Sequence, residues 1–590
     1  MPNKPFCHSK FIGYVSLVSP QFTKIHFPSS TLLNHYVYNG VSYSGGIVGN
    51  YVVIEGETYG FIGKLIEVDL PETERLKLSE KAFSTKDFHP EGKVELLMSF
   101  DLYNPEKISL GLDCFPAVGA KVYVCSSAFI QKYLVKFGDK NKIDDPPLIK
   151  LGTLTSDATS KLTVSQQALF GRHCAIIGTT GGGKSWTVKT LIEQAYRNGT
   201  KIILLDSTGE YANHQLNNAV DCRIGVNSYF HYNNLTIDDL FFLVKPSGRA
   251  QAPKLVEAIT SLKVVRLLSE SEQEVSKKFP IENGRFKKTG FEIRAFERYC
   301  YSNTNIIDSP FLKFDIEQLP HQIVNECIYA SDRNNPALYG GLSDQELSNC
   351  TSMISRIKNI TQNPIFKSSF GVQPNHDAID LGVEIDTFID SDKTSLLRIG
   401  FENVSFQSQY REILANAIAS NLLAKARNKK FKTQPVIFII DEAHQYLNKT
   451  INDEYFGPHA LDAFDQIAKE CRKYGLFLCL ATQMPRDIPA GTLSQMGTFI
   501  VHRLINYNDK EAVANACSSA NRSALSFLPV LGEGEAILTG VDFPMPVSIK
   551  VDRPERPPES ETPLFYKKDL EHQENKDTTN AAPQIEELPA

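Results

Sequence analysis

The chain has 590 residues, so we expect roughly two to four domains. Hydrophobic residues make up 42% of it and charged residues 22%, values typical of globular proteins, and the net charge of −6 argues against a uniformly basic nucleic-acid binder. The longest apolar runs are strand-sized, residues 1–11 lack an apolar stretch, and the cysteines form no Cys-x-x-Cys pair. We therefore expect no membrane span, no signal peptide, and reduced thiols in a cytoplasmic protein.

Residues 1–145 are predicted to be all-β. Segments 46–55 and 59–68 are rich in β-branched and aromatic residues and are interrupted by glycine, and segments 94–100 and 121–125 add further strands. Short strands at this spacing predict a small barrel. Residues 139–147 are polar and contain proline, which is typical of a linker.

Residues 151–550 have a different texture, in which apolar strands alternate with helices. Buried strands are predicted over residues 201–206, 436–440, 475–481 and 498–504. This alternation predicts a parallel sheet. A charged stretch with helical periodicity, about residues 235–390, is predicted to be a helical insertion in this sheet domain.

Residues 551–590 carry proline, glutamate, asparagine and threonine with few apolar residues, so we expect a partly disordered tail. Its one apolar patch, residues 564–566, could clasp a neighbouring subunit.

Residues 178–185 read Gly-Thr-Thr-Gly-Gly-Gly-Lys-Ser, a complete phosphate-binding loop between an apolar strand and a helix. The glycines let backbone N–H groups turn toward phosphate oxygens at the positive end of the helix dipole. Lys184 would reach the β- and γ-phosphates of ATP, and the Ser185 hydroxyl would bind Mg²⁺. The predicted nucleotide contacts are Gly178, Thr179, Thr180, Gly181, Gly182, Gly183, Lys184, Ser185 and Trp186, together with Asp206.

The strand at residues 436–440 ends in Asp441 and Glu442, the pair that a Mg²⁺-dependent ATPase requires. Asp441 would hold the Mg²⁺ shell through water, and Glu442 would polarise the attacking water. Asp206 ends the strand that follows the phosphate-loop helix, at the sheet edge where α/β folds bind ligands, although a plain strand-end turn is the alternative.

Gln483 ends the next strand and could sense the γ-phosphate or place the water. Three arginines are candidates for stabilising charge in the transition state, with surface ion pairs as the alternative: Arg172, Arg472 and Arg503.

The sequence at Asp441 to His444 looks like the DEAH box of two-lobed helicases, but the rest of the chain disagrees. Lys184 and Asp441 are too far apart for such a core without a large insertion, and too few residues follow Gln483 for a second lobe. A single phosphate-loop core must take its arginine from a neighbour, which implies a ring of subunits.

Motifs spread along the chain resemble the HerA family of hexameric ATPases, relatives of FtsK-type DNA translocases and conjugative coupling proteins. The matching segments are 47–54, 60–68, 172–173, 178–185, 205–211, 435–444, 468–476, 481–485, 499–506 and 528–536. Cys471 stands where the family usually has glycine, Ser207 and Thr208 replace the commoner Pro-His, and the helical insertion matches least.

The resemblance implies a RecA-like α/β core with a helical insertion behind an N-terminal β-barrel. It implies an ATP- and Mg²⁺-dependent homohexamer that moves or unwinds double-stranded DNA. It also implies an effector docked on the barrel, a nuclease or a sirtuin-like NAD-consuming protein, in DNA end processing or antiphage defence. An alternative is an ATP-dependent scaffold that assembles an effector without processive translocation, and a conjugative DNA pump would require membrane spans.

Overall fold

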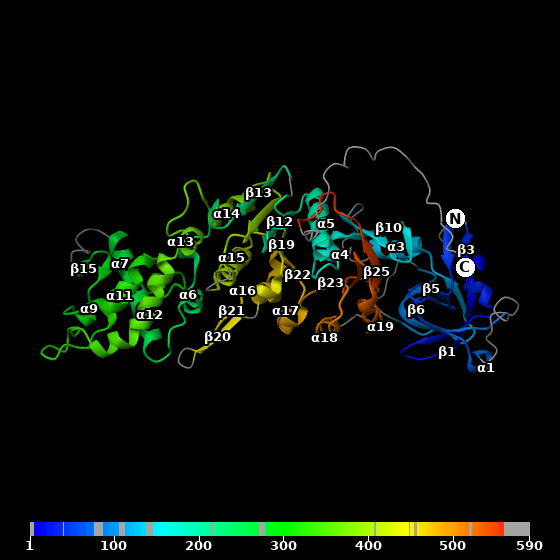
Figure 1. The fold of residues 1–590 in the computed structure, drawn as a ribbon, viewed down its shortest axis with the longest axis horizontal. Coiled ribbons are helices and arrows are strands. Elements are labelled where there is room, and N and C mark those ends of the chain that lie inside the picture. The colour runs from blue at the N-terminus through cyan, green and yellow to red at the C-terminus, as the bar shows by residue number, and fades with distance from the viewer. Residues whose placement is uncertain are drawn as a thin grey trace, which may run out of the picture.

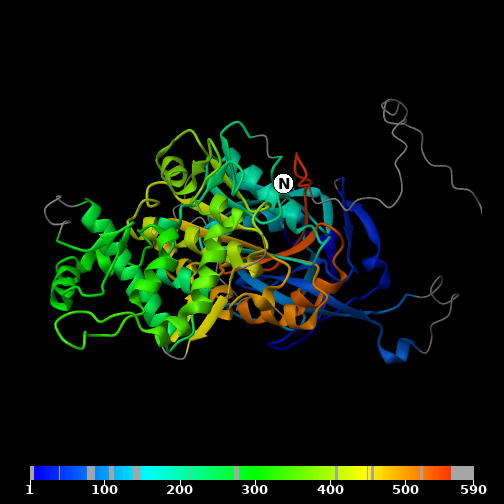
Figure 2. The ribbon, with the colours of Figure 1, turned by 60° about the vertical axis from the view of Figure 1, so that its left-hand side comes forward.

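The computed structural model describes residues 5–38, 40–75, 87–104, 112–136, 146–213, 216–270, 278–405, 409–447, 449–453, 457–517 and 522–559. The predicted linker at 139–145 and the apolar patch at 564–566 lie outside these ranges. Figure 1 shows an elongated arrangement, with helices such as α7 and α12 at one end, a large sheet in the middle and a barrel at the other end. The turned view in Figure 2 keeps the helical end and the barrel apart.

The N-terminal strands close into a barrel in the order β1-β2-β7-β6-β5-β8. Along β7 buried and half-buried residues alternate over its first half, as expected of a strand with one face inside a barrel. The strands are β1 (Phe11–Val18), β2 (Thr23–His26), β5 (Tyr51–Glu55), β6 (Tyr59–Asp69), β7 (Glu91–Asp101) and β8 (Lys121–Val124). The predicted barrel is therefore confirmed.

Among the described residues, eleven strands form one sheet, in the order β10-β9-β25-β24-β23-β11-β22-β19-β12-β18-β13. From β23 to β13 all neighbours are parallel, whereas β24, β25, β9 and β10 add to one side antiparallel. The sheet is thus mixed, where the sequence predicted a parallel one throughout. Its strands are β9 (Leu148–Leu154), β10 (Asp157–Ser165), β11 (Cys174–Ile177), β12 (Lys201–Asp206), β13 (Ala219–Arg223), β18 (Leu396–Gly400), β19 (Val436–Ile440), β22 (Leu476–Thr482), β23 (Thr498–His502), β24 (Glu535–Gly540) and β25 (Val547–Val551).

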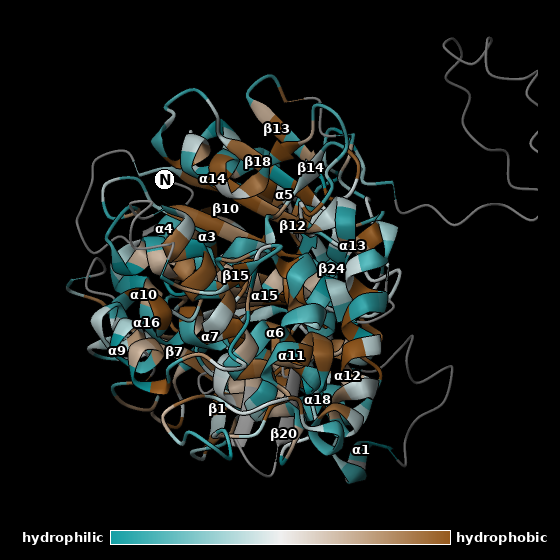
Figure 3. Ribbon diagram, turned by 90° about the vertical axis from the view of Figure 1, so that its left-hand side faces the viewer, coloured by the Kyte–Doolittle hydropathy of each residue, from teal (hydrophilic) through white to brown (hydrophobic). Residues whose placement is uncertain are grey.

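The central parallel strands are apolar because both of their faces are covered. Every residue of β12 and of β19 is buried, and helices α5 (Lys184–Arg197) and α15 (Tyr410–Arg427) supply apolar side chains to the clusters on the two faces. Figure 3, viewed from the helical end, shows these hydrophobic strands within helices whose outer faces are hydrophilic. Continuous apolar runs are typical of such doubly covered strands.

The helical insertion lies between β13 and β18. Its main helices are α6 (Ile237–Val244), α7 (Gln251–Glu270), α9 (Ile293–Ser302), α11 (Leu319–Glu326), α12 (Asp344–Gln362), α13 (Pro364–Ser369) and α14 (Leu381–Asp390). Thr236 and Asp239 form a reciprocal capping box that starts α6, and Ser343 caps α12. The predicted insertion in an α/β core is confirmed, and the exact domain boundaries stay predictions.

The barrel contacts the ATPase sheet through β25. Lys64 of β6 donates to Ser548 Oγ at 3.0 Å, and the Tyr51 hydroxyl accepts from the Ser548 N–H at 3.1 Å. The antiparallel strands that extend the sheet therefore also connect it to the barrel. In the part of the chain that the structure describes, no helix is long and apolar enough to cross a membrane.

Candidate nucleotide site

The phosphate loop lies between β11 and α5, at the carboxyl edge of the parallel strands. Gly181 and Gly183 have φ angles of 75° and 104°, which favour glycine because they lie in the left-handed region. A Cβ on Gly178 would lie 2.6 Å from Cβ of His502, so a side chain there would collide with β23. The Thr179 N–H donates to the Arg503 carbonyl at 3.1 Å, which ties the loop to the end of β23.

The catalytic carboxylates follow β19, which is separated from β11 by β22 alone. The Lys184 ammonium donates to Glu442 Oε1 and lies 3.6 Å from Asp441 Oδ1. Gln483 Nε2, at the end of β22, donates to the same Glu442 oxygen at 2.6 Å. Glu442 has a φ of 49°, an uncommon conformation for a non-glycine residue that often occurs at functional sites. The structure therefore brings Lys184, Asp441, Glu442 and Gln483 together.

The polar atoms around Ser185 fit a divalent cation with oxygen ligands. Asp441 Oδ1 and Glu210 Oε2 are buried and have no hydrogen-bond partner among the described residues. Burial raises the pKa of Asp441 to about 7, while the Lys184 ammonium acts in the opposite direction. Because Mg²⁺ prefers oxygen ligands, Ser185 and Asp441 are suited to hold it beside the β- and γ-phosphates.

Glu210 is a site residue that the sequence analysis missed. Its side chain hydrogen-bonds to Ser185 and lines the nucleotide cavity. Burial raises the pKa of Glu210, and the Ser185 hydrogen bond and the Lys184 charge oppose that shift. The signal was its position in the turn after β12, but attention went to Asp206, which ends the strand itself.

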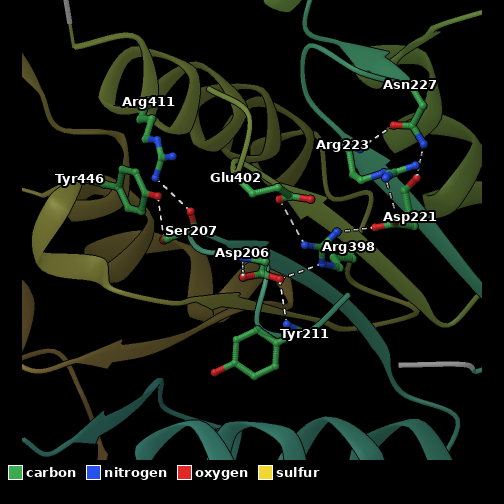
Figure 4. A network of polar contacts seen from close by, with 11 residues as sticks. Asp206, Ser207, Tyr211, Asp221, Arg223, Asn227, Arg398, Glu402, Arg411 and Tyr446 are labelled. Atoms are coloured by element: carbon green, nitrogen blue, oxygen red, sulfur yellow. Dashed lines mark hydrogen bonds and ion pairs between the residues drawn. The ribbon is translucent and has the colours of Figure 1, made fainter. Parts of the chain in front are cut away.

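Asp206 is engaged elsewhere, as Figure 4 shows. Its Oδ1 accepts from the Gly209 N–H at 2.9 Å, and its Oδ2 accepts from the Tyr211 N–H at 3.1 Å and from Arg398 Nε at 2.8 Å. Both oxygens are therefore used within the protein, and Asp206 is absent from the cavity lining. This corrects its predicted role: Asp206 holds the turn that carries Glu210, and it does not face the nucleotide.

The arginine candidates lie in two different places. Arg172 precedes β11 and Arg472 precedes β22, so both stand at the amino edge of the sheet, opposite the phosphate loop. Arg172 Nε donates to Asp542 at 2.8 Å, and Arg472 lines a second cavity of about 540 Å³ at that edge. Arg503 follows β23 beside the phosphate loop, and its side chain is exposed.

The nucleotide cavity has a volume of about 790 Å³, within the usual range for small-molecule sites. Among the residues that the structure describes, no arginine lines it. The lining residues are Thr179, Thr180, Gly181, Gly183, Lys184, Ser185, Trp186, Glu210, Glu442, Gln483, Gly532, Glu533, Gly534, Glu535, Lys550 and Val551. The chain can therefore surround a triphosphate with a lysine and carboxylates, but not with an arginine.

Comparisons with known proteins agree with this geometry. Residues 149–298 match the family profile described as "Helicase HerA, central domain", and residues 426–581 match "Helicase HerA-like C-terminal". The "DNA double-strand break repair helicase HerA" of Sulfurisphaera tokodaii is 24% identical over 421 residues, 69% of this chain and 69% of that protein. The protein of the same name from Pyrococcus furiosus is 21% identical over 425 residues, 68% of this chain and 69% of its own length. Among solved structures, the bacterial conjugative coupling protein TrwB aligns with 74% of this chain and 94% of its own, at 11% identity and a TM-score of 0.42.

Proposed function

The chain belongs to the HerA helicase family and is an ATPase, and from this premise we propose that it moves along double-stranded DNA as a homohexameric ring. The observation that carries the proposal is the incomplete cavity. Its phosphate-binding and water-activating side chains are present, but no described arginine lines it. A ring of subunits supplies what this arrangement lacks.

Within one subunit the chemistry is divided between the two ends of the triphosphate. The loop N–H groups and Lys184 bind the β- and γ-phosphates, and Ser185 with Asp441 would hold Mg²⁺, which neutralises developing charge on the phosphates. Glu442 would accept a proton from the attacking water, and the Gln483 amide, which donates to Glu442 at 2.6 Å, keeps that carboxylate in position. When nucleotide enters, Lys184 would exchange its contact with Glu442 for the phosphates, which releases the base.

The missing positive charge would come from an adjacent subunit. Arg172 and Arg472 stand at the sheet edge opposite the phosphate loop, so neither can reach the site of its own chain. Asp542 engages Nε of Arg172, which leaves the two Nη groups to act as the phosphate-facing fork. An arginine supplied in this way contributes about 10³–10⁵ in rate.

Hydrolysis with and without long duplex DNA tests the motor. We expect duplex DNA to stimulate turnover several-fold, and Glu442→Gln to lower turnover by about 100-fold or more while ATP still binds. Turnover that long duplex leaves unchanged, or a normal rate in Glu442→Gln, would favour the alternative of an ATP-dependent scaffold.

We also propose that the barrel docks an effector, a nuclease or a sirtuin-like NAD-consuming protein, in DNA end processing or antiphage defence. Exposed apolar side chains on the barrel support a docking role, among them Leu17 on β1 and Val118 in the turn whose Gly119 bonds to Val15. Co-expression with the product of the neighbouring reading frame should give a stable complex, measured by light scattering. Val118→Glu should weaken that complex and leave basal ATP hydrolysis unchanged, and a complex that ignores Val118→Glu would rule out this surface.

A cytoplasmic location is consistent with the thiols. All cysteines are free, including Cys174 and Cys479, which are direct neighbours in register on β11 and β22. Such a pair is expected to stay reduced in a reducing compartment.

A further inference from the structure

The segment after β25, residues 552–559, runs back along the phosphate-loop helix α5, and we call it the C-terminal strap. Thr190 of α5 donates to the Asp552 carbonyl at 3.3 Å. The N–H groups of Glu555 and Arg556 donate to the Glu193 carboxylate at 3.1 and 3.3 Å. The strap reaches the catalytic turn, where the Glu559 N–H donates to the Glu210 carbonyl at 2.9 Å. Backbone contacts thus hold the strap beside the nucleotide site along its whole described length.

The strap places a cation on the only tryptophan of the chain. The Arg553 guanidinium lies 5.5 Å from the ring centre of Trp186, within the range of a cation–π contact. Trp186 is half-buried and lines the nucleotide cavity together with Lys550 and Val551, the last residues before the strap. An aromatic surface in this position has no role in the phosphate chemistry described above.

The cavity has more room than the phosphates need. The phosphate end is defined by Lys184, which contacts Glu442 and Asp441. Trp186 lies two residues further along, and the cavity continues between it and β25, over a total of about 790 Å³. A flat aromatic ring recognises another flat aromatic ring by stacking, and a nucleobase is the part of ATP that offers one.

We propose that the base of the bound nucleotide stacks on Trp186, that Arg553 of the C-terminal strap is the positioning residue for the indole, and that purines are favoured over pyrimidines because their stacking surface is larger. This proposal rests on nucleotide binding at the phosphate loop and is independent of DNA. It makes the C-terminal strap a part of the nucleotide site.

Because Trp186 is the only tryptophan, its fluorescence reports directly on its own environment. The full-length protein is titrated, without DNA, with the magnesium complexes of β,γ-imido-ATP, β,γ-imido-UTP and inorganic tripolyphosphate. We expect the ATP analogue to change the emission strongly and to bind about 10-fold more tightly than tripolyphosphate, with the UTP analogue between them. Equal affinities for the ATP analogue and tripolyphosphate would overturn the proposal.

Variants measured by calorimetry separate stacking from folding. Trp186→Ala should lower affinity for the ATP analogue by about 10-fold and leave that for tripolyphosphate unchanged, whereas Trp186→Phe should retain most of the affinity. Arg553→Ala should lower ATP-analogue affinity by a smaller factor, about 3-fold, and Arg553→Lys should restore it. The matched control is Glu555→Ala, which removes only an exposed ion pair with Arg197 on the same strap.

Two results would contradict the assignment of roles. If Trp186→Ala weakens both ligands equally, the indole only supports the phosphate loop. If Glu555→Ala matches Arg553→Ala, the strap acts by packing and Arg553 has no specific effect. A chain that discriminates the ATP analogue from tripolyphosphate but shows no DNA-stimulated turnover would retain this proposal and lose the motor function.

Discussion

At the scale of single residues, the site depends on carboxylates whose positions are set by contacts from several strands. Glu442 adopts a left-handed backbone conformation and is held by Lys184 and Gln483. Glu210 comes from the turn after β12 and meets Ser185 from another direction. The two carboxylates therefore have separate jobs, with Glu442 near the attacking water and Glu210 near the metal shell.

Glu210→Gln tests this division of labour. We expect kcat to fall by about 10- to 100-fold, because a neutral amide supports the Mg²⁺ shell less well, and KM for ATP to change little. Steady-state hydrolysis over a range of ATP and Mg²⁺ concentrations measures both constants. Glu533→Gln, an exposed carboxylate in the same cavity lining, serves as the control and should behave as wild type. An unchanged kcat in Glu210→Gln would remove Glu210 from the site.

Two buried histidines should make the core sensitive to acid. Burial lowers the pKa of His173 and of His502 to about 4 each. Between about pH 6.5 and 4 the unfolded chain binds more protons at these groups than the folded one, so the stability present above pH 6.5 is lost as pH falls through this window.

His173→Asn isolates one of the two contributions. His173 has a φ of 69° and its Nδ1 accepts from the Leu478 N–H at 2.9 Å, and asparagine tolerates that φ and offers Oδ1 as an acceptor. The melting temperature of this variant should fall less steeply than that of wild type between pH 6.5 and 5, measured by calorimetry. A slope equal to that of wild type would mean that His173 is not a source of the acid sensitivity.

At the scale of elements, a buried ion-pair network joins three neighbouring strands under the catalytic turn. Arg398 of β18 is fully buried and binds Asp206 of β12, Asp221 of β13 and Glu402 at 2.8, 2.6 and 3.2 Å. The network sets the position of the turn that follows Asp206 and hence of Glu210 (Figure 4). The strands at this side of the sheet thus act on the site through Asp206.

Removing the arginine should destabilise the core strongly. Arg398→Met leaves Asp206 buried without its partner, and we expect a loss of about 3–5 kcal/mol in the free energy of unfolding. Urea denaturation followed by circular dichroism measures the loss, and Arg266→Met, which breaks an exposed pair with Glu270, should cost less than about 1 kcal/mol. Adding Asp206→Asn to Arg398→Met should restore part of the stability, and a loss as small as that of Arg266→Met would show that the network does not stabilise the core.

At the scale of the whole molecule, the two edges of the sheet have complementary contents. The carboxyl edge carries the phosphate loop and the carboxylates, and the amino edge carries Arg172 and Arg472. Subunits arranged edge to edge around a ring would combine the two halves at each interface. The barrel contacts β25, and β25 ends at the nucleotide cavity, so the same strand links the nucleotide to the part of the molecule where we propose a partner.

Mixed rings test whether the arginine acts between subunits. Lys184→Ala and Arg172→Ala should each abolish hydrolysis alone, because one removes the phosphate contact and the other the neighbour's charge. An equimolar mixture, assembled after reversible dissociation, should recover about a quarter of wild-type turnover, since intact Lys184 then meets intact Arg172 at some interfaces. The same mixture with Arg472→Ala examines the second candidate, and recovery in neither mixture would contradict an arginine acting in trans.

The sequence by itself determined the features that are written in contiguous residues. The phosphate loop, the strand ending in Asp441 and Glu442, the β-rich N-terminal region and the helical insertion could all be predicted, because glycine geometry, apolar runs and helical periodicity are local signals. Gln483 was predicted at its strand end, and the structure joins it to Glu442.

Only the tertiary structure decided how distant segments meet. Arg398 takes both the charge and the position of Asp206, and no local pattern links residues so far apart in the chain. The antiparallel strands beside β23, and the strap that brings Arg553 to Trp186, likewise result from long-range pairing. The physical reason is that sheet order and side-chain partners are set by packing of the whole chain, whereas the sequence pattern specifies only which segments form strands and which loops bind phosphate.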